Sequence, residues 1–205
     1  MTTIYLLRHG ESEANVRRVF SNGKLDLPLT ELGRQQAARA GRWLMDKGIT
    51  HVYTAPLLRA RQTARILAEQ LILGDPIVLQ DLDEVRVGDL DTRDDTEAWA
   101  CYDVIFGAWL NGDEDSRFPG GESFAEARHR YAAALRQIAD AHPNGTVVAA
   151  THGGIQLTVL PRLCPTITFG PAGPQMPHVA INRLEVTPDG IACSLWASTA
   201  HLETD

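Results

Sequence analysis

The residues best suited to chemistry lie near the start of the chain, where an apolar run ends at a charged tripeptide. Ile4 to Leu7 is typical of a short buried β-strand, and Arg8, His9 and Gly10 follow it directly. An Arg guanidinium offers a planar fork of donors that fits phosphate oxygens. A His can act as a nucleophile or base near neutral pH, and a Gly lets a ligand approach the backbone. This stretch therefore predicts an anion site at the end of the first strand.

A second histidine occupies a matching position late in the chain. Residues 146–150 form another apolar run, which ends at residues 151–154, Thr-His-Gly-Gly. Because groups beyond the carboxyl ends of parallel strands meet at one sheet edge, His9 and His152 should lie together if both strands are parallel and central. Arg59 is expected near the N-terminus of a helix, where backbone N–H groups already favour anions. These residues add to the predicted anion site.

Length and composition limit the classes of protein that the chain can be. Its 205 residues, 44% apolar and 22% charged, suit one α/β domain over residues 1–205. The net charge of −7 argues against general binding to nucleic acid or anionic membranes, which needs a basic face. No signal pattern starts the chain, and no apolar run approaches the ~20 residues that span a bilayer.

The cysteines indicate a reducing environment. Cys101, Cys164 and Cys193 are odd in number, widely spaced and without a CxxC pair, so neither a zinc ribbon nor a disulfide framework is predicted. We expect reduced, mostly buried thiols in a cytoplasmic protein.

Hydrophobic periodicity and turn residues predict strands that alternate with helices and end in a hairpin. The predicted strands cover residues 4–7, 51–54, 77–79, 146–150, 180–186 and 191–198. The predicted helices cover residues 31–46, 57–71, 97–110, 124–142 and 155–163. A Pro- and Gly-rich loop over the sheet is expected at residues 164–178. The pattern predicts an α/β fold, a three-layer α/β/α sandwich with a mostly parallel, mixed central sheet.

Five motif blocks in a fixed order span nearly the whole chain. They are Leu7-Arg8-His9-Gly10-Glu11-Ser12 with Asn15 and Asp26-x-Pro28-Leu29-Thr30-x-x-Gly33; Thr54-Ala55-Pro56-Leu57-x-Arg59-Ala60-x-Gln62-Thr63-Ala64; Leu82-x-Glu84-x-x-x-Gly88; Gly120-Gly121-Glu122-Ser123; and Thr151-His152-Gly153-Gly154. This order resembles the histidine phosphatase superfamily, in its phosphoglycerate mutase-like branch. The chain departs from the pattern after Gly88, where it continues Asp89-Leu90-Asp91-Thr92 instead of Trp/Leu-Glu-Gly.

The resemblance implies a phosphohistidine mechanism. His9 would attack phosphorus, and Glu84 would protonate the leaving oxygen, with Asp83 as the competing acid. The equatorial oxygens would be held by Arg8, Arg59 and His152, which supply up to three positive charges. Phosphoryl transfer depends mainly on such positioning and charge. Further predicted substrate contacts, alongside Arg8 and Arg59, are Asn15, Ser21, Asn22, Gly23, Gly153 and His178.

The loops at residues 16–24, 85–118 and 164–178 are expected to set specificity. The middle region is strongly acidic, which predicts a preference against bulky polyanions. It also favours a phosphatase over a mutase, because mutases of this family carry extra basic residues there. Trp99 or Trp109 could form a wall of the substrate pocket.

The sequence therefore favours a metal-independent phosphomonoesterase that acts on a small-molecule phosphate monoester and needs no cofactor. The alternatives are a cofactor-dependent phosphoglycerate mutase and a non-catalytic binder of phosphorylated ligands. A metallohydrolase is disfavoured, because no HxH or HExxH pair is present and the two arginines would repel a cation. The oligomeric state is left open.

Overall fold

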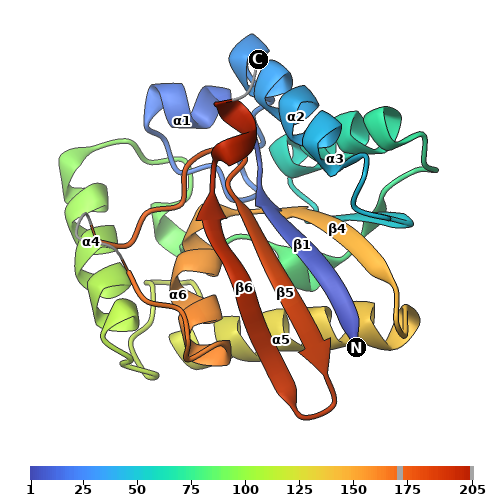
Figure 1. Ribbon diagram of the computed structural model, residues 1–205. Helices are drawn as coiled ribbons and strands as arrows, with labels where there is room; N and C mark the ends of the chain where they lie inside the picture. The colour runs from blue at the N-terminus through green and yellow to red at the C-terminus, as the bar shows by residue number, and fades with distance from the viewer. Residues whose placement is uncertain (170–172, 204–205) are drawn as a thin grey trace.

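A computed structural model describes residues 1–169 and 173–203 (Figure 1). The six strands are β1 (Thr2–Arg8), β2 (His51–Thr54), β3 (Ile77–Val78), β4 (Thr146–Thr151), β5 (Ile181–Thr187) and β6 (Gly190–Ser198). They form one sheet in the order β3-β2-β4-β1-β5-β6. The first four of this order are parallel, whereas β5 is antiparallel to β1 and β6 is antiparallel to β5. The two strands that precede the histidines, β1 and β4, are therefore neighbours at the centre.

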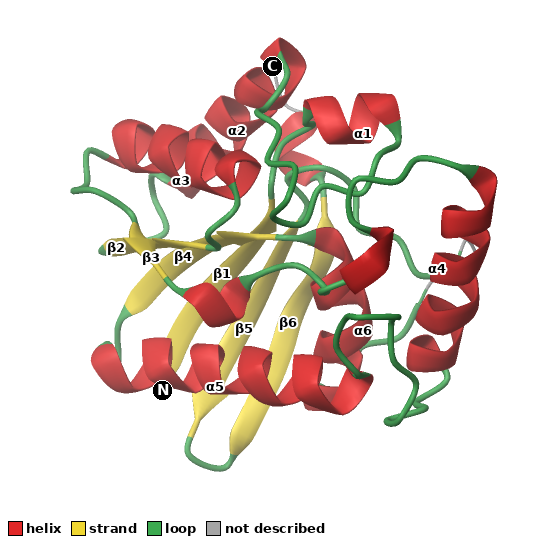
Figure 2. Ribbon diagram, turned by 180° about the vertical axis from the view of Figure 1, so that it is seen from behind, coloured by secondary structure: helices red, strands yellow, loops and turns green. Residues whose placement is uncertain are grey.

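Helices cover both faces of the sheet (Figure 2). They are α1 (Glu13–Arg17), α2 (Glu31–Leu44), α3 (Leu58–Leu71), α4 (Thr96–Leu110), α5 (Phe124–Ala141) and α6 (Gly153–Leu163). Short 3₁₀ turns are η1 (Gln80–Leu82), η2 (Gly88–Leu90) and η3 (Ala200–Leu202). In Figure 2, α2 and α3 lie on one side of the sheet and α5 on the other. Helix α6 lies between the sheet and α4. Among the described residues, no helix is long and apolar enough to cross a bilayer.

The central strand β1 is apolar on both faces, as expected for a strand between two helical layers. Ile4 and Leu6 pack into the core that α5 and α6 cover. Tyr5 and Leu7, which alternate with them, pack into the core under α2 and α3. Burial on both sides fixes the register of β1 and hence the position of the residues that follow it.

The predicted three-layer α/β fold is confirmed, and the predicted strands and helices all occur with small shifts at their ends. Helix α1 was not predicted, since five mostly polar residues give no periodic signal. The loop predicted at residues 164–178 falls partly on residues 170–172, which lie outside the described part. Because strands from both ends of the chain share the sheet, we propose that residues 1–205 form one domain.

Candidate active site

The carboxyl ends of β1 and β4 bring the two predicted histidines together. The strands are adjacent and parallel, with Arg8 opposite Thr151, so each histidine follows its strand at the same sheet edge. The ring centroids of His9 and His152 lie 5.3 Å apart. Both side chains are buried, with 2% of His9 and 0% of His152 exposed. The predicted meeting of the two histidines is confirmed.

Two hydrogen bonds fix the protonation pattern of the His9 ring. Its Nδ1 lies 2.7 Å from the carbonyl oxygen of Gly10, which can only accept, so Nδ1 carries the hydrogen. Arg59 Nε donates to His9 Nε2 at 3.0 Å, so Nε2 holds a lone pair. Burial lowers the pKa of His9 well below its ordinary value, and Arg59 and His152 lower it further. His9 is therefore a neutral imidazole whose Nε2 can act as a nucleophile.

Hydrogen bonds at the start of α3 and at the guanidinium position Arg59. It lies in the first turn of α3, where the N–H of Leu58 donates to the carboxylate of Asp26 at 2.9 Å. Its Nη1 donates to the carbonyl oxygen of Ser21 at 2.7 Å, and its side chain is buried. The helix start and the loop together keep the guanidinium against His9.

Arg8 supplies a second guanidinium with a free donor. Its Nη1 donates to the carbonyl oxygen of Met176 at 2.6 Å, whereas its buried Nε has no hydrogen-bond partner. Burial lowers the pKa of Arg8 to about 10, so the group stays charged at neutral pH. Gly153 makes room for it, because a Cβ on Gly153 would lie 3.1 Å from the Arg8 side chain. An anion could accept from the unpaired Nε–H.

His152 differs from the expected third positive charge. Burial lowers its pKa well below the ordinary value, and Arg59 and Arg130 lower it further. Both ring nitrogens are buried without a hydrogen-bond partner, although Nε2 lies 3.7 Å from Asp83 Oδ1. The ring is therefore neutral in the free protein, and the two guanidinium groups supply the positive charge. A neutral imidazole still offers one N–H to a phosphate oxygen.

The acid loop presents its two carboxylates differently. Glu84 lines the cavity and accepts hydrogen bonds from the backbone N–H groups of Gly154 at 3.0 Å and Ile155 at 2.7 Å, at the start of α6. Asp83 is not among the cavity-lining residues and accepts from the N–H of Glu84 at 2.9 Å. Burial raises the pKa of Asp83 to about 6. Of the two candidate acids, only Glu84 therefore lines the cavity.

Four of the six further predicted substrate contacts line a cavity of about 480 Å³. Its lining includes Asn15, Ser21, Asn22 and Gly153, with Arg8, His9, Arg59 and Glu84 at the charged end. Gly23 is exposed and does not line the cavity. His178 is half-buried and also off the cavity wall, with its ring centroid 6.2 Å from that of His9.

Sequence reasoning missed most of the apolar wall of this cavity. Trp99 lines it as suggested, but Trp109 is fully buried in the core. Tyr102 and Phe106 on α4 and Leu157 on α6 also line it. The signal was present, because positions 99, 102 and 106 have the i, i+3, i+7 spacing of one helix face.

Comparison with known proteins identifies the family. A sequence profile of the histidine phosphatase superfamily (branch 1) matches residues 4–199. The chain belongs to this superfamily. The resemblance that the five motif blocks carry is confirmed, and the chain has the α/β fold of its structural relatives.

Three similar proteins illustrate the relatives of this chain. Phosphoglycerate mutase-like protein 4 of Arabidopsis thaliana is 31% identical over 203 residues, which cover 98% of this chain and 86% of the relative. A metal-independent phosphoserine phosphatase of the same plant is 29% identical and matches 100% of this chain and 84% of its own. The structure of YhfR from Bacillus stearothermophilus superposes with a TM-score of 0.83 at 28% identity, covering 98% of this chain and 100% of that one.

Proposed function

We propose that this chain is a metal-independent phosphomonoesterase that hydrolyses small phosphorylated metabolites through a phosphohistidine on His9. The observation that carries the proposal is the hydrogen bonding of the His9 ring. Nδ1 donates to Gly10, and Nε2 keeps its lone pair beside the guanidinium of Arg59. A histidine held as this tautomer, between two arginines, is prepared to attack an electrophile that carries negative charge.

The reaction has two steps. His9 Nε2 forms a bond to phosphorus as the ester P–O bond breaks, and a carboxylic acid gives its proton to the leaving alkoxide. Arg8 Nε and Arg59 then hold the equatorial oxygens, where charge develops, and His152 donates one further N–H. In the second step water gives a proton to the carboxylate and attacks phosphorus as the P–N bond of the phosphohistidine breaks. Inorganic phosphate then leaves, and both Nε2 and the acid are regenerated. We propose Glu84 as the acid, since it lines the cavity and Asp83 does not.

Metal independence is part of the proposal. The positive charge that a metal ion would bring is already supplied by two guanidinium groups. These groups would also repel a cation from the two histidines. The metal-independent phosphoserine phosphatase relative supports the same view.

A phosphoglycerate mutase is the competing enzyme, supported by the mutase-like relative. It would return the phosphoryl group to the substrate instead of to water. The acidic stretch at residues 81–116, in which Arg86 and Arg93 are the only arginines and no lysine occurs, favours the phosphatase. A non-catalytic binder is the third reading. It is disfavoured because the nucleophile, the acid and both arginines are all present.

The test is phosphate release from a panel of phosphomonoesters with a chelator present. We expect release by the wild type in chelator, and a loss of at least ~10³-fold for His9→Ala because the nucleophile is removed. The matched control is His129→Ala, which removes an exposed histidine away from the cavity. 3-Phosphoglycerate is included, with its isomers resolved.

Quenched reactions with labelled ester add a direct readout. Phosphate bound to the protein in an acid-labile, alkali-stable form should occur in the wild type and in His129→Ala, but not in His9→Ala. Isomerisation of 3-phosphoglycerate without release would make the chain a mutase. Binding of esters with neither release nor isomerisation would leave the non-catalytic binder. Release that stops with chelator and returns with metal would refute metal independence.

A further inference from the structure

The cavity beside His9 has two ends of opposite character. One end holds Arg8, His9, Arg59 and Glu84. The other is bounded by hydrocarbon and aromatic rings, which are contributed by Val19, Phe20, Trp99, Tyr102, Phe106 and Leu157. A volume of about 480 Å³ leaves room for a group well beyond a phosphate.

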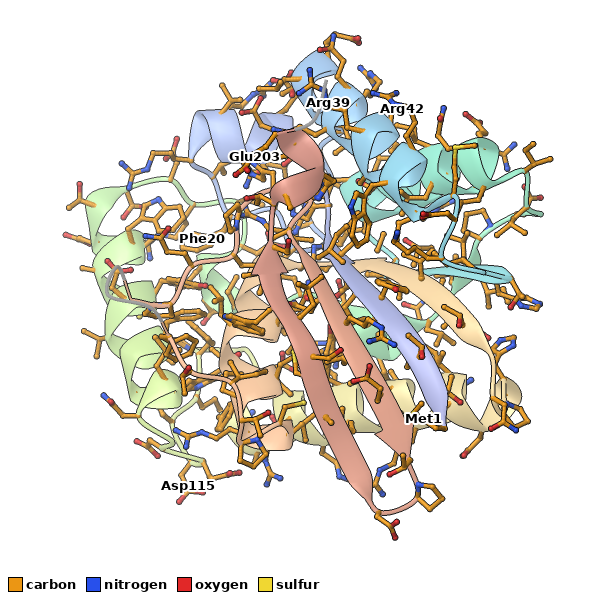
Figure 3. The ribbon with its side chains drawn as sticks, in the orientation of Figure 1. Met1, Phe20, Arg39, Arg42, Asp115 and Glu203 are labelled. Carbon is orange, nitrogen blue, oxygen red and sulfur yellow. The ribbon has the colours of Figure 1, made fainter. Side chains whose placement is uncertain are left out.

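The apolar end is a packed aromatic wall. Phe20 stacks on Trp99 with ring centroids 4.2 Å apart, and it lies 5.2 Å from the ring of Tyr102. Tyr102 in turn stacks on Phe106 at 5.1 Å. Phe20, labelled in Figure 3, comes from the loop after α1, whereas the other three rings come from α4. Contacts between these rings hold the wall in place without a ligand.

Tyr102 is the ionisable side chain among these four rings, and burial keeps it neutral. Burial raises the pKa of Tyr102 well above its ordinary value, and nearby Glu84 raises it further, so the phenol stays neutral. Among the described residues, the charged side chains of the cavity lining are Arg8, Arg59 and Glu84, beside His9. Arg18 lies 5.5 Å from the Trp99 ring centroid but does not line the cavity. A carboxylate or ammonium group placed against these four rings would therefore lose water without gaining an oppositely charged partner among them.

We propose that the preferred substrate is a phosphomonoester of an uncharged, largely apolar alcohol, which lies against Phe20, Trp99, Tyr102 and Phe106. The proposal rests on the proposed function and names the substrate class for it. The phosphoryl group takes the charged end, and the alcohol part gains affinity by leaving water. Each buried methylene is worth roughly a fourfold gain in affinity.

The experiment compares esters whose leaving groups are alike. 2-Phenylethyl phosphate and ethyl phosphate are both esters of primary alcohols, so their kcat/KM ratio reports chiefly on contacts with the apolar body. We expect 2-phenylethyl phosphate to be favoured about 10- to 100-fold, from the area of one ring. Phosphoserine and 3-phosphoglycerate, which add charged groups at comparable size, should be slower than 2-phenylethyl phosphate.

Two variants on one helix locate the effect. Phe106→Ala removes a ring from the wall and should lower the ratio about tenfold. Val104→Ala is the matched control, because Val104 lies on the same helix with 74% of its surface exposed and does not line the cavity. Since the readout is a ratio within each protein, a loss of folded enzyme does not imitate the result.

The outcomes separate this proposal from the proposed function. If phosphoserine or 3-phosphoglycerate is turned over faster than 2-phenylethyl phosphate, the substrate class is wrong and the phosphatase stands. A ratio that stays the same in Phe106→Ala as in Val104→Ala also overturns the role of the wall. If no ester releases phosphate, the proposed function fails, and the substrate class falls with it.

Discussion

At the scale of single residues, Asp83 and Glu84 differ in position. Glu84 lines the cavity, and its charge raises the pKa of Arg8 against the effect of burial, as expected for close neighbours. Asp83 has a pKa of about 6, raised by burial, but it lies beside His152 and off the cavity wall. Since a proton must be handed over at hydrogen-bond distance, this difference in position supports the proposal of Glu84 as the acid.

Replacement of Glu84 by Gln should depend on the leaving group. An alkyl phosphate leaves as a poor alkoxide that needs a proton, so kcat/KM for 2-phenylethyl phosphate should fall ~10²–10⁴-fold in Glu84→Gln. A 4-nitrophenolate is stable without a proton, so kcat/KM for 4-nitrophenyl phosphate should fall by less than about tenfold. Steady-state kinetics with the two esters measures the difference.

Asp83→Asn is the matched variant, because it also replaces one carboxylate with an amide. We expect it to slow both esters by a similar factor, since it changes the surroundings of His152 and not the proton supply. The assignment would be reversed if Asp83→Asn showed the leaving-group dependence and Glu84→Gln did not.

The sequence could predict His9, His152 and Arg8 as site residues because each lies at the end of an apolar strand. It could not predict that His152 is neutral, since that depends on complete burial next to Arg59 and Arg130. Ionisation is set by groups that are distant in the chain, and a motif does not contain them.

At the scale of elements, α5 holds the acid loop. Arg130 on α5 pairs with Glu122 at 2.6 Å, and both side chains are less than a tenth exposed. Its guanidinium also donates to the carbonyl oxygens of Asp81, Asp83 and Glu84 at 2.8–3.0 Å. The loop has little regular structure of its own, so these bonds fix its backbone.

Arg130→Lys should loosen the acid loop while it keeps the charge that Glu122 needs. One ammonium cannot replace a fork that reaches three carbonyls, so we expect a loss of about 1–3 kcal/mol in the free energy of unfolding. We also expect kcat/KM to fall more for 2-phenylethyl phosphate than for 4-nitrophenyl phosphate, because the acid is displaced. Urea unfolding and the two-ester assay measure these effects.

The control for this change is Arg136→Lys, an exposed position on the same helix. It should leave both the stability and the ratio of the two esters unchanged. Equal slowing of both esters by Arg130→Lys would show that the hydrogen bonds of Arg130 support the fold without positioning the acid.

Helices and strands with a clear hydrophobic periodicity could be predicted from the sequence, whereas close contacts between backbone segments could not. Long apolar patterns gave the helices and strands almost to their ends. Only the fold explains why glycine is needed at positions 10 and 33 of the first motif block. A Cβ on Gly10 would lie 2.3 Å from the carbonyl oxygen of Gly33. The start of α2 thus packs directly on the chain after His9, which positions the loop.

At the scale of the whole molecule, buried histidines make folding sensitive to acid. The pKa values of His9 and His152 are well below ordinary, chiefly through burial. Below the unfolded pKa of ~6.5, the unfolded chain takes up protons at these positions and the folded chain does not. The free energy of unfolding should therefore fall by about 1.4 kcal/mol per pH unit for each histidine as the pH drops.

Asp83 opposes this trend over part of the range. Its folded pKa of about 6 lies above the ~3.9 of an unfolded Asp, so between these values the folded chain binds the extra proton. His9 and His152 against Asp83 leave a net loss of about 1.4 kcal/mol per pH unit as the pH falls below 6. His178 and His201, whose pKa values burial lowers to about 4, add to the loss in the same direction. Above pH 7 these groups should give no slope.

Urea unfolding at several pH values between 4.5 and 7.5 measures this slope. His152→Gln removes one buried histidine, so the slope should fall by about 1.4 kcal/mol per pH unit between pH 4.5 and 6. His129→Gln, at an exposed position, should keep the slope of the wild type. If His152→Gln keeps that slope as well, His152 is protonated in the folded protein, and the site would then carry three positive charges below pH 6.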